Sequence, residues 1–286
     1  MDKKKILLFG ASGMIGHMAY AYLKSTDKYT ITPVVFKNKI NPEDVVVDVS
    51  EKQRVVDLIQ TEKPDLIVNC SGVIIGGSKK YPDNAILLNA YLPHLLMRIA
   101  DDMGCKLIHI STDCVFSGKK GAYGEDDIKD ADDLYGRSKG LGEIVSDRHL
   151  TLRTSTIGPE IKKDGEGLFH WFMQQSGSIN GFTQAYWSGI TTLELAKAID
   201  KGISNNLTGL LHVNNGEKIS KYDLVNLFKT IWNKNNLEIV RYESKVVDKS
   251  LLKSTKFDFG IPGYKQMLLD QKEWMDDHKY LYNQMY

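Results

Sequence analysis

Two residues four positions apart carry the clearest chemical signal in the sequence. Tyr135 and Lys139 belong to the segment YGRSK, and a helix there would place the phenol and the ammonium on one face. A neighbouring lysine cation favours the phenolate and lowers the pKa of a phenol. We therefore expect Tyr135 to serve as a general acid or base near neutral pH, with Lys139 adjusting its pKa.

A hydroxyl residue is expected beside this pair. The apolar run KLIHI, residues 106–110, reads as a buried strand, and Ser111 and Thr112 follow it directly. Side chains at the carboxyl end of a parallel strand point into the ligand crevice of an open α/β sheet. Thr112 can then donate a hydrogen bond to a substrate oxygen.

A glycine-rich turn near the N-terminus predicts a dinucleotide site. It follows a predicted strand and opens a predicted helix, and its residues are Gly10, Ser12, Gly13, Met14, Ile15 and Gly16. Glycines at such a turn allow the backbone to approach a diphosphate at the helix N-terminus. Lys37, after the second strand, stands where an NAD site usually has an acid, and its charge suits a 2′-phosphate. This favours NADPH, or tolerance of both NADPH and NADH; the alternative for Lys37 is an ordinary surface lysine.

Alternating strands and helices predict the fold class of the first half. Helices are expected over residues 15–23, 52–60, 85–103 and 134–146, and strands over residues 5–9, 29–36, 45–47, 65–69, 106–110 and 150–153. Buried strands separated by helices indicate a parallel sheet covered on both faces. Right-handed crossovers then give a Rossmann-type doubly wound α/β domain.

The second half has a different pattern. Residues 154–188 read as aromatic-rich loop, and short strands are expected at 210–212 and 238–241. Helices are expected at 192–203, 220–232 and 266–278. We expect residues 1–155 to form an NAD(P)-binding Rossmann domain, to which the helix at 190–204 returns. Residues 156–286 are then mainly a smaller mixed α/β substrate-binding subdomain.

Composition excludes several classes of protein. The chain has 286 residues, a net charge of +1 and 42% hydrophobic residues, so nothing favours nucleic acid or an anionic membrane as a partner. The three cysteines form no CxxC pair, and no His, Cys or acidic cluster has metal-ligand spacing. No signal peptide or membrane span is evident, and free thiols fit a reducing compartment. We expect a cytoplasmic protein without a metal.

Together these motifs resemble those of the extended short-chain dehydrogenase/reductases. The run STDCVFSG at residues 111–118, YGRSKGLGE at 135–143, KPDLIVNC at 63–70 and LRT at 152–154 are similar to the dTDP-4-dehydrorhamnose reductase branch. The similarity is close over about residues 4–156 and loose in the C-terminal third. It implies an NAD(P)H-dependent reductase of a nucleotide-activated 4-keto-6-deoxy sugar, active in deoxysugar and surface polysaccharide biosynthesis. A homodimer is the family expectation.

The resemblance also implies roles for residues. Thr112 is the hydroxyl partner, Tyr135 donates the proton to the C4 alkoxide, and Lys139 tunes Tyr135 and binds the nicotinamide ribose. Further residues are expected to contact the cofactor, namely Asp48 and Val49 near the adenine, and Cys70, Ser71 and Gly72 after the fourth strand. The expected substrate contacts are Asp113, Cys114, His170, Trp187 and Lys249.

One departure from the family pattern leaves alternatives open. Cys114 stands where this branch usually has tyrosine. It either simply replaces a ring that lines the pocket, or acts as the base of an epimerase/reductase with His170 as its partner. A thiol is competent for this only as an accessible thiolate. A third alternative is a dinucleotide-binding regulatory subunit without catalysis, against which the intact set of Thr112, Tyr135 and Lys139 argues.

Overall fold

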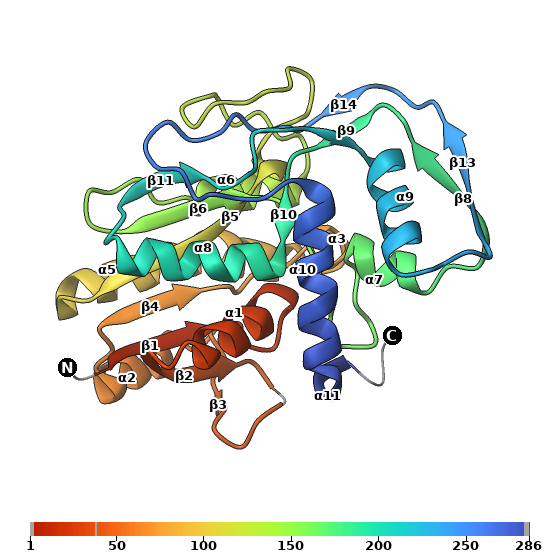
Figure 1. The fold of residues 1–286 in the computed structure, drawn as a ribbon. Coiled ribbons are helices and arrows are strands. Elements are labelled where there is room, and N and C mark those ends of the chain that lie inside the picture. The colour runs from red at the N-terminus through yellow and green to blue at the C-terminus, as the bar shows by residue number, and fades with distance from the viewer. Residues whose placement is uncertain (1–2, 38, 283–285) are drawn as a thin grey trace.

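A seven-stranded parallel sheet forms the centre of the protein (Figure 1). The computed structural model describes residues 3–37, 39–282 and 286. The strand order is β11-β6-β5-β4-β1-β2-β3, and neighbouring strands are parallel throughout. The strands are β1 (Lys4–Phe9), β2 (Tyr29–Val35), β3 (Val45–Val46), β4 (Leu66–Asn69), β5 (Lys106–Thr112), β6 (Leu150–Thr154) and β11 (Gly209–His212). This confirms the predicted doubly wound sheet.

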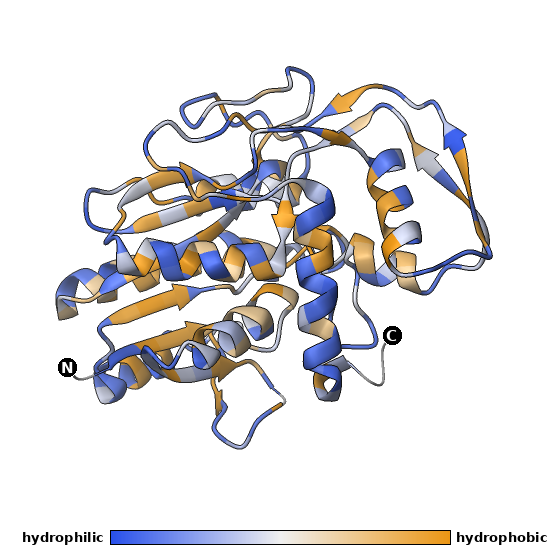
Figure 2. Ribbon diagram, in the orientation of Figure 1, coloured by the Kyte–Doolittle hydropathy of each residue, from blue (hydrophilic) through white to orange (hydrophobic). Residues whose placement is uncertain are grey.

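Helices cover both faces of the sheet. Alternate side chains of β1 enter separate apolar cores, because successive residues of a strand point to opposite faces. Leu8 packs in the core shared with α1 (Met14–Ser25) and α8 (Thr192–Ser204). Leu7 packs in the core shared with α2 (Lys52–Glu62) and α5 (Leu92–Met103). Burial on both faces explains why the strands are mostly hydrophobic along their length (Figure 2).

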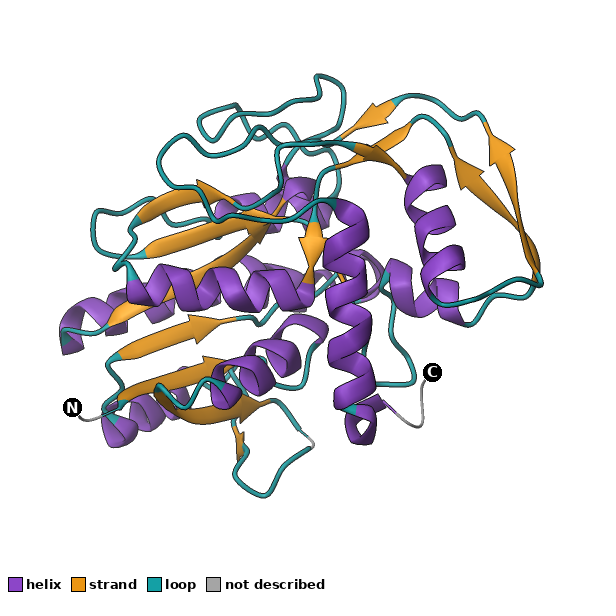
Figure 3. Cartoon of the chain, in the orientation of Figure 1, coloured by secondary structure: helices purple, strands orange, loops and turns teal. Residues whose placement is uncertain are grey.

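A smaller mixed part lies beyond the carboxyl ends of the central strands, on the right in Figures 1 and 3. It contains a parallel pair, β8 with β13, and a three-stranded sheet of order β12-β9-β14. A further short pair, β7 with β10, joins the two parts. The elements are β7 (Thr156–Ile157), α7 (Leu168–Met173), β8 (Gly177–Phe182), β9 (Ala185–Trp187), β10 (Ile190–Thr191), β12 (Ile219–Ser220), α9 (Lys221–Ile231), β13 (Leu237–Tyr242), β14 (Val247–Asp248), α10 (Tyr264–Asp277) and α11 (Lys279–Tyr282).

The helix expected at 85–103 is confirmed. It begins as α4 (Pro82–Ala85), passes through a π-helix, η1 (Ile86–Tyr91), and continues as α5; α3 (Ile75–Lys80) precedes it. Two other expectations about secondary structure were wrong. The segment 154–188 is not mainly loop, since it contains α7, β8 and β9. The helix expected at 134–146 is only α6 (Leu134–Leu141), which ends where Gly142 meets η1. A Cβ on Gly142 would lie 1.9 Å from the carbonyl oxygen of Asn89, so only glycine permits this contact.

Two absences are found among the described residues. In the described part of the chain, no helix is both long and apolar enough to cross a membrane. Among the same residues, no three His, Cys, Asp or Glu side chains are grouped so that they could hold a metal ion.

Two buried histidines should make the folding stability of the protein sensitive to acid. His17 donates from Nδ1 to the Gly13 carbonyl and accepts at Nε2 from the Tyr282 hydroxyl, and His212 likewise accepts at Nε2 from Arg153. Burial lowers the pKa of each histidine to about 4. Because the unfolded rings titrate near pH 6.5, stability is complete above that pH and is lost as pH falls towards 4. We expect each ring to contribute about 3 kcal/mol to this loss.

Urea unfolding at a series of pH values measures the loss. Between about pH 6.5 and 4, the unfolding free energy of the wild type should fall with pH. In a His17→Gln variant, the share of this fall that His17 contributes should disappear. A wild-type unfolding free energy that stays level over this interval would contradict the expectation.

Candidate active site

A cavity of about 400 Å³ lies at the carboxyl ends of four neighbouring strands. Its lining includes residues 12–15 after β1, 70–75 after β4, 110–112 at the end of β5 and 154–156 at the end of β6. The chain reverses its direction of winding between β1 and β4. Open α/β sheets bind their ligands at such a point, so the topology alone marks this cavity as the candidate site.

The glycine turn forms one wall of the cavity. Gly10 has φ +78°, and a Cβ on it would lie 2.8 Å from the Ser71 nitrogen. A Cβ on Gly16 would lie 2.0 Å from the Gly10 carbonyl oxygen, so Gly10 and Gly16 close the turn. A Cβ on Gly13 would meet only that oxygen, at 3.4 Å. Gly13 therefore leaves open space before the first turn of α1, which no side chain caps. Unpaired N–H groups facing such a space fit a diphosphate.

Thr112 and Tyr135 reach the cavity from neighbouring elements. Thr112 ends β5, where its hydroxyl donates to Asp113 at 3.2 Å and accepts from the Cys114 nitrogen at 3.2 Å. Tyr135 lies in the first turn of α6, which Asp133 caps through the Gly136 nitrogen at 2.7 Å. A Cβ on Gly136 would lie 2.1 Å from the Cys114 carbonyl oxygen. Glycine thus lets α6 begin directly against the end of β5, and both hydroxyls line one cavity.

Lys139 also lines the cavity and is 5% exposed. Its Nζ donates to the carbonyl oxygen of Ile110 at 2.6 Å. Burial lowers the pKa of Lys139 to about 8, and the charge of Glu143 opposes this effect. Lys139 therefore titrates close to the working range of most enzymes.

The expected lowering of the pKa of Tyr135 is not found. Burial raises this pKa, Cys114 raises it further, and the hydrogen bond with Thr112 only partly compensates. The Lys139 ammonium is engaged by the Ile110 carbonyl. Tyr135 is consequently a neutral phenol over the neutral pH range, which suits a proton donor rather than a base.

Cys114 lines the cavity next to Thr112, and Asp113 and Lys249 lie beside Cys114 without lining the cavity themselves. Burial raises the pKa of Asp113, while the Lys249 ammonium counteracts this. Burial and the neighbouring Asp113 raise the pKa of Cys114 to about 12. Lys249 is partly buried and contacts the Cys114 thiol, and these two neighbours raise the pKa of Lys249 against the effect of burial. The structure thus brings the three residues together, with Cys114 as a thiol.

Two predicted substrate residues lie away from the cavity. His170 is buried on α7, where its Nδ1 meets the Tyr286 hydroxyl at 2.9 Å and its Nε2 the Gln174 amide at 2.7 Å. Trp187 is buried on β9 beside Tyr264. Neither lines the cavity. Both positions belong to the packing of the smaller part, so the structure does not support the expected substrate contacts.

Three predicted cofactor residues lie beyond the cavity lining, near the ends of β2 and β3. Lys37 is exposed, and its Nζ lies 4.9 Å from the centre of the Phe36 ring. Asp48 accepts from the Ser50 nitrogen and hydroxyl, which hold its pKa below the usual range. Val49 is partly buried against the apolar core of α2 and α5. The three residues thus follow the two strands at the β3 edge of the sheet, outside the cavity lining.

The sequence did not reveal three further residues of the site. Glu160 and Glu166 line the cavity, and Glu166 accepts from the Gly76 nitrogen at 3.2 Å. Nothing in the loop sequence around them marks this position. Asn89 is buried, and its side-chain amide accepts from the Val73 nitrogen and donates to the Val73 carbonyl. It also donates to the Ser138 hydroxyl at 3.1 Å. A polar residue within the apolar run 85–103 was the available signal for it.

Comparisons with known proteins bear on the family and the fold of the chain. The profile of the RmlD substrate binding domain family matches residues 4–249. The structure of dTDP-4-dehydrorhamnose reductase from Yersinia enterocolitica is similar with a TM-score of 0.76 and 25% identity, covering 94% of this chain and 98% of that one. The Bacillus anthracis reductase in complex with NADP has a TM-score of 0.81, covers 96% and 100%, and at 19% identity shows the fold alone. Methionine adenosyltransferase 2 subunit beta of Xenopus laevis is 25% identical over 78% of this chain and 71% of that protein.

Proposed function

The chain belongs to the RmlD substrate binding domain family, and we propose that it is an NAD(P)H-dependent reductase of a nucleotide-activated 4-keto-6-deoxy sugar. One observation carries the proposal: Thr112, Tyr135 and Lys139 line the same cavity as the open glycine turn. A hydrogen-bonding hydroxyl, a neutral phenol and a cation beside a dinucleotide cradle are the groups that a carbonyl reduction requires.

The residues present fit a dinucleotide. The open space at Gly13 and the first turn of α1 would hold the diphosphate, and Lys139 the nicotinamide ribose. Cys70, Ser71 and Gly72 would line the cofactor, and Asp48 and Val49 would lie near the adenine. Lys37 would meet a 2′-phosphate, so we propose NADPH as the preferred form. When bound, the cofactor supplies the hydride.

The chain itself orients the carbonyl and moves a proton. Thr112 Oγ1 and the Tyr135 hydroxyl would both donate to the oxygen at C4, which fixes the sugar and draws charge onto that oxygen. Tyr135 would then release its proton to the oxygen as it becomes an alkoxide. The raised pKa of Tyr135 keeps this proton in place until the alkoxide, a much stronger base, develops.

The epimerase/reductase alternative has less support. Burial keeps Cys114 protonated, and His170 is bonded to Tyr286 and Gln174 outside the cavity. A thiol without a base at hand does not abstract a proton from a sugar carbon. We propose instead that Cys114, with Asp113 and Lys249, lines the sugar pocket.

We further propose the division into two functional parts. Residues 1–155 hold the cofactor, and residues 156–286 mainly hold the nucleotide sugar. Two elements of the second range, α8 and β11, belong physically to the central sheet.

A second candidate is a dinucleotide-binding regulatory subunit. The similarity to methionine adenosyltransferase 2 subunit beta favours it. It predicts NADPH binding without turnover and a stable complex with another protein.

NADPH oxidation, followed by absorbance, separates the candidates. The substrates are enzymatically prepared dTDP- and UDP-linked 4-keto-6-deoxy sugars, each tested with NADPH and with NADH. Turnover with either sugar supports the reductase, and the faster cofactor tests the role of Lys37. NADPH binding without turnover on any nucleotide sugar, together with capture of a partner protein, would favour the regulatory subunit.

A further inference from the structure

A buried histidine contacts the glycine turn without lining the cavity itself. His17 of α1 is 5% exposed. Its Nδ1 lies 2.9 Å from the Gly13 carbonyl oxygen, and its own backbone nitrogen donates to the same oxygen at 3.0 Å. One carbonyl of the turn therefore accepts two hydrogen bonds from one residue.

The other ring nitrogen of His17 is bonded to the C-terminal part of the chain. Nε2 lies 3.1 Å from the hydroxyl of Tyr282, which belongs to α11 and is 3% exposed. The two rings pack edge to face with their centres 5.8 Å apart. A carbonyl oxygen can only accept, so Nδ1 carries the proton, and burial keeps the ring neutral by lowering its pKa to about 4. Nε2 is then an acceptor, and the Tyr282 hydroxyl fixes this tautomer.

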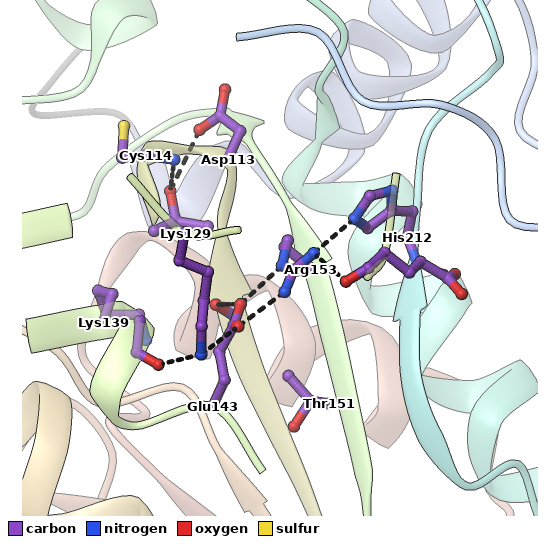
Figure 4. A network of polar contacts seen from close by, with 12 residues as sticks. Asp113, Cys114, Lys129, Lys139, Glu143, Thr151, Arg153 and His212 are labelled. Atoms are coloured by element: carbon purple, nitrogen blue, oxygen red, sulfur yellow. Dashed lines mark hydrogen bonds and ion pairs between the residues drawn. The ribbon is translucent and has the colours of Figure 1, made fainter. Parts of the chain in front are cut away.

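His212 is bonded at both ring nitrogens in the same way and serves as an internal comparison (Figure 4). Its Nε2 accepts from Arg153, and its Nδ1 donates to the Leu252 carbonyl at 3.0 Å. None of these three residues lines the cavity. The bond of His17 differs because its carbonyl belongs to the turn that forms one wall of the cavity.

The carbonyl that His17 bonds shares a peptide group with a free donor. The Gly13 carbonyl and the Met14 N–H belong to one planar unit, and Met14 begins α1 and lines the cavity. The first N–H groups of a helix have no acceptor within the helix, and no side chain of the described residues caps this turn. Hydrogen bonds to a carbonyl polarise its peptide group and so strengthen the N–H as a donor. His17 therefore acts on an N–H group that would meet the diphosphate.

We propose that His17 is a positioning residue for the cofactor, which fixes and polarises the peptide between Gly13 and Met14, and that Tyr282 fixes the tautomer of His17. The inference deepens the proposed function and rests on it only for the place of the diphosphate at the first turn of α1. It concerns dinucleotide affinity and does not require turnover.

The test compares the dissociation constants of NADPH and NADH, measured by quenching of protein fluorescence. His17→Leu removes the bond to Gly13, and both affinities should fall by about three- to tenfold, the range that one hydrogen bond is worth. The loss should be the same factor for both cofactors, because they share the diphosphate. A loss confined to NADPH would place the effect at the 2′-phosphate and overturn the proposal.

A double variant separates positioning from stability. His17→Leu alone leaves the Tyr282 hydroxyl buried without a partner, which destabilises the fold. His17→Leu with Tyr282→Phe removes both polar groups, and apolar replacement of both partners of a buried hydrogen bond costs little stability. Urea unfolding should therefore return to near the wild-type value, while the loss of affinity persists. The proposal is overturned if this folded double variant binds NADPH as tightly as the wild type.

A conservative variant and a matched control complete the series. In His17→Asn the amide can donate to the same carbonyl, as Asn226 does to the Tyr222 carbonyl at 2.8 Å, and affinity should return to within about twofold of wild type. His278 Nδ1 bonds the Trp274 carbonyl at 2.9 Å with the same spacing of four residues, and neither lines the cavity. His278→Leu should therefore bind NADPH like the wild type. An equal loss in this control would contradict a specific role of His17.

The tautomer gives a spectroscopic readout that needs no cofactor. With ¹⁵N-labelled histidine, the ring nitrogen shifts of His17 can be assigned by comparison with His17→Leu, and in the wild type they should show the Nδ1–H form. In Tyr282→Phe they should move towards a mixture of both tautomers, because no donor fixes Nε2. A wild-type ring that carries its proton on Nε2 would refute the proposed bond to Gly13.

Turnover separates the inference from the proposed function. If the reductase assay succeeds, His17→Leu should raise the KM for NADPH by the same factor as the dissociation constant and keep kcat within about twofold of wild type. If NADPH binds but no nucleotide sugar is turned over, the reductase fails and the binding constants still decide the inference. If the wild type binds neither dinucleotide, both are overturned.

Discussion

Tyr135→Phe should lower kcat by about 1000-fold or more and leave NADPH affinity within about twofold of wild type. The change removes the group that we propose as the proton donor to the C4 oxygen, and general acid catalysis is typically worth about 10² to 10⁴ in rate. The ring itself remains, so packing at the start of α6 is retained. Steady-state NADPH oxidation measures kcat, and quenching of protein fluorescence measures NADPH binding.

The exposed Tyr81 provides the control for this substitution. Tyr81→Phe removes a hydroxyl at the surface and should retain wild-type kcat. A Tyr135→Phe enzyme that turns over at the wild-type rate would overturn the assignment of Tyr135 as the proton donor.

The second large effect is expected at the glycine turn, where Gly16→Ala and Gly13→Ala should differ in kind. A methyl group on Gly16 would lie 2.0 Å from the Gly10 carbonyl oxygen, which is backbone and cannot move aside. The turn must then open, with a loss of about 3 kcal/mol of stability, at the upper end of overpacking costs. NADPH affinity should fall at least about 100-fold, because the turn no longer presents the N-terminus of α1 to the diphosphate.

At Gly13 the same methyl group meets little protein. The free energy of unfolding of the Gly13→Ala variant should change by less than about 1 kcal/mol, because replacing glycine by alanine at a helix N-cap costs a few tenths of a kcal/mol to about 1 kcal/mol. The methyl group instead enters the space reserved for the diphosphate and should weaken NADPH binding at least about tenfold. Thermal unfolding and NADPH titration of both variants give the comparison. Equal affinity in Gly13→Ala and wild type would show that the diphosphate lies elsewhere.

The sequence predicted well those features that arise from local pattern. The apolar strands, the glycine turn and the i, i+4 pair Tyr135 and Lys139 are each formed by residues close together in the chain. The placement of each follows from the periodicity of helices and strands. The position of Thr112 at the cavity could be predicted because strand ends in a parallel sheet meet at one edge.

Features that depend on distant contacts could not be predicted in this way. β8 forms because it pairs with β13, about 60 residues later; the sequence indicated β13 as a strand at 238–241, but no local signal marks β8. The pKa of Tyr135 depends on burial and on an ammonium that binds the Ile110 carbonyl instead of acting on the phenol. His170 lies among aromatic residues that read equally well as a pocket or as core, and the structure shows core.

The return of the chain to its first sheet affects how the protein folds while it is being synthesised. α8 supplies Leu195 and Ile199 to the core on one face, and β11 completes the sheet beside β6. Both elements leave the ribosome only after α7, β8 and β9 have been made. Until residue 212 has emerged, the nascent chain exposes an apolar sheet face and an unpaired edge at β6, which are the features that attract chaperones and aggregate. Residues 1–155, which we propose hold the cofactor, therefore cannot complete their sheet as an independent N-terminal unit, and a chain cut at residue 155 would lack both elements.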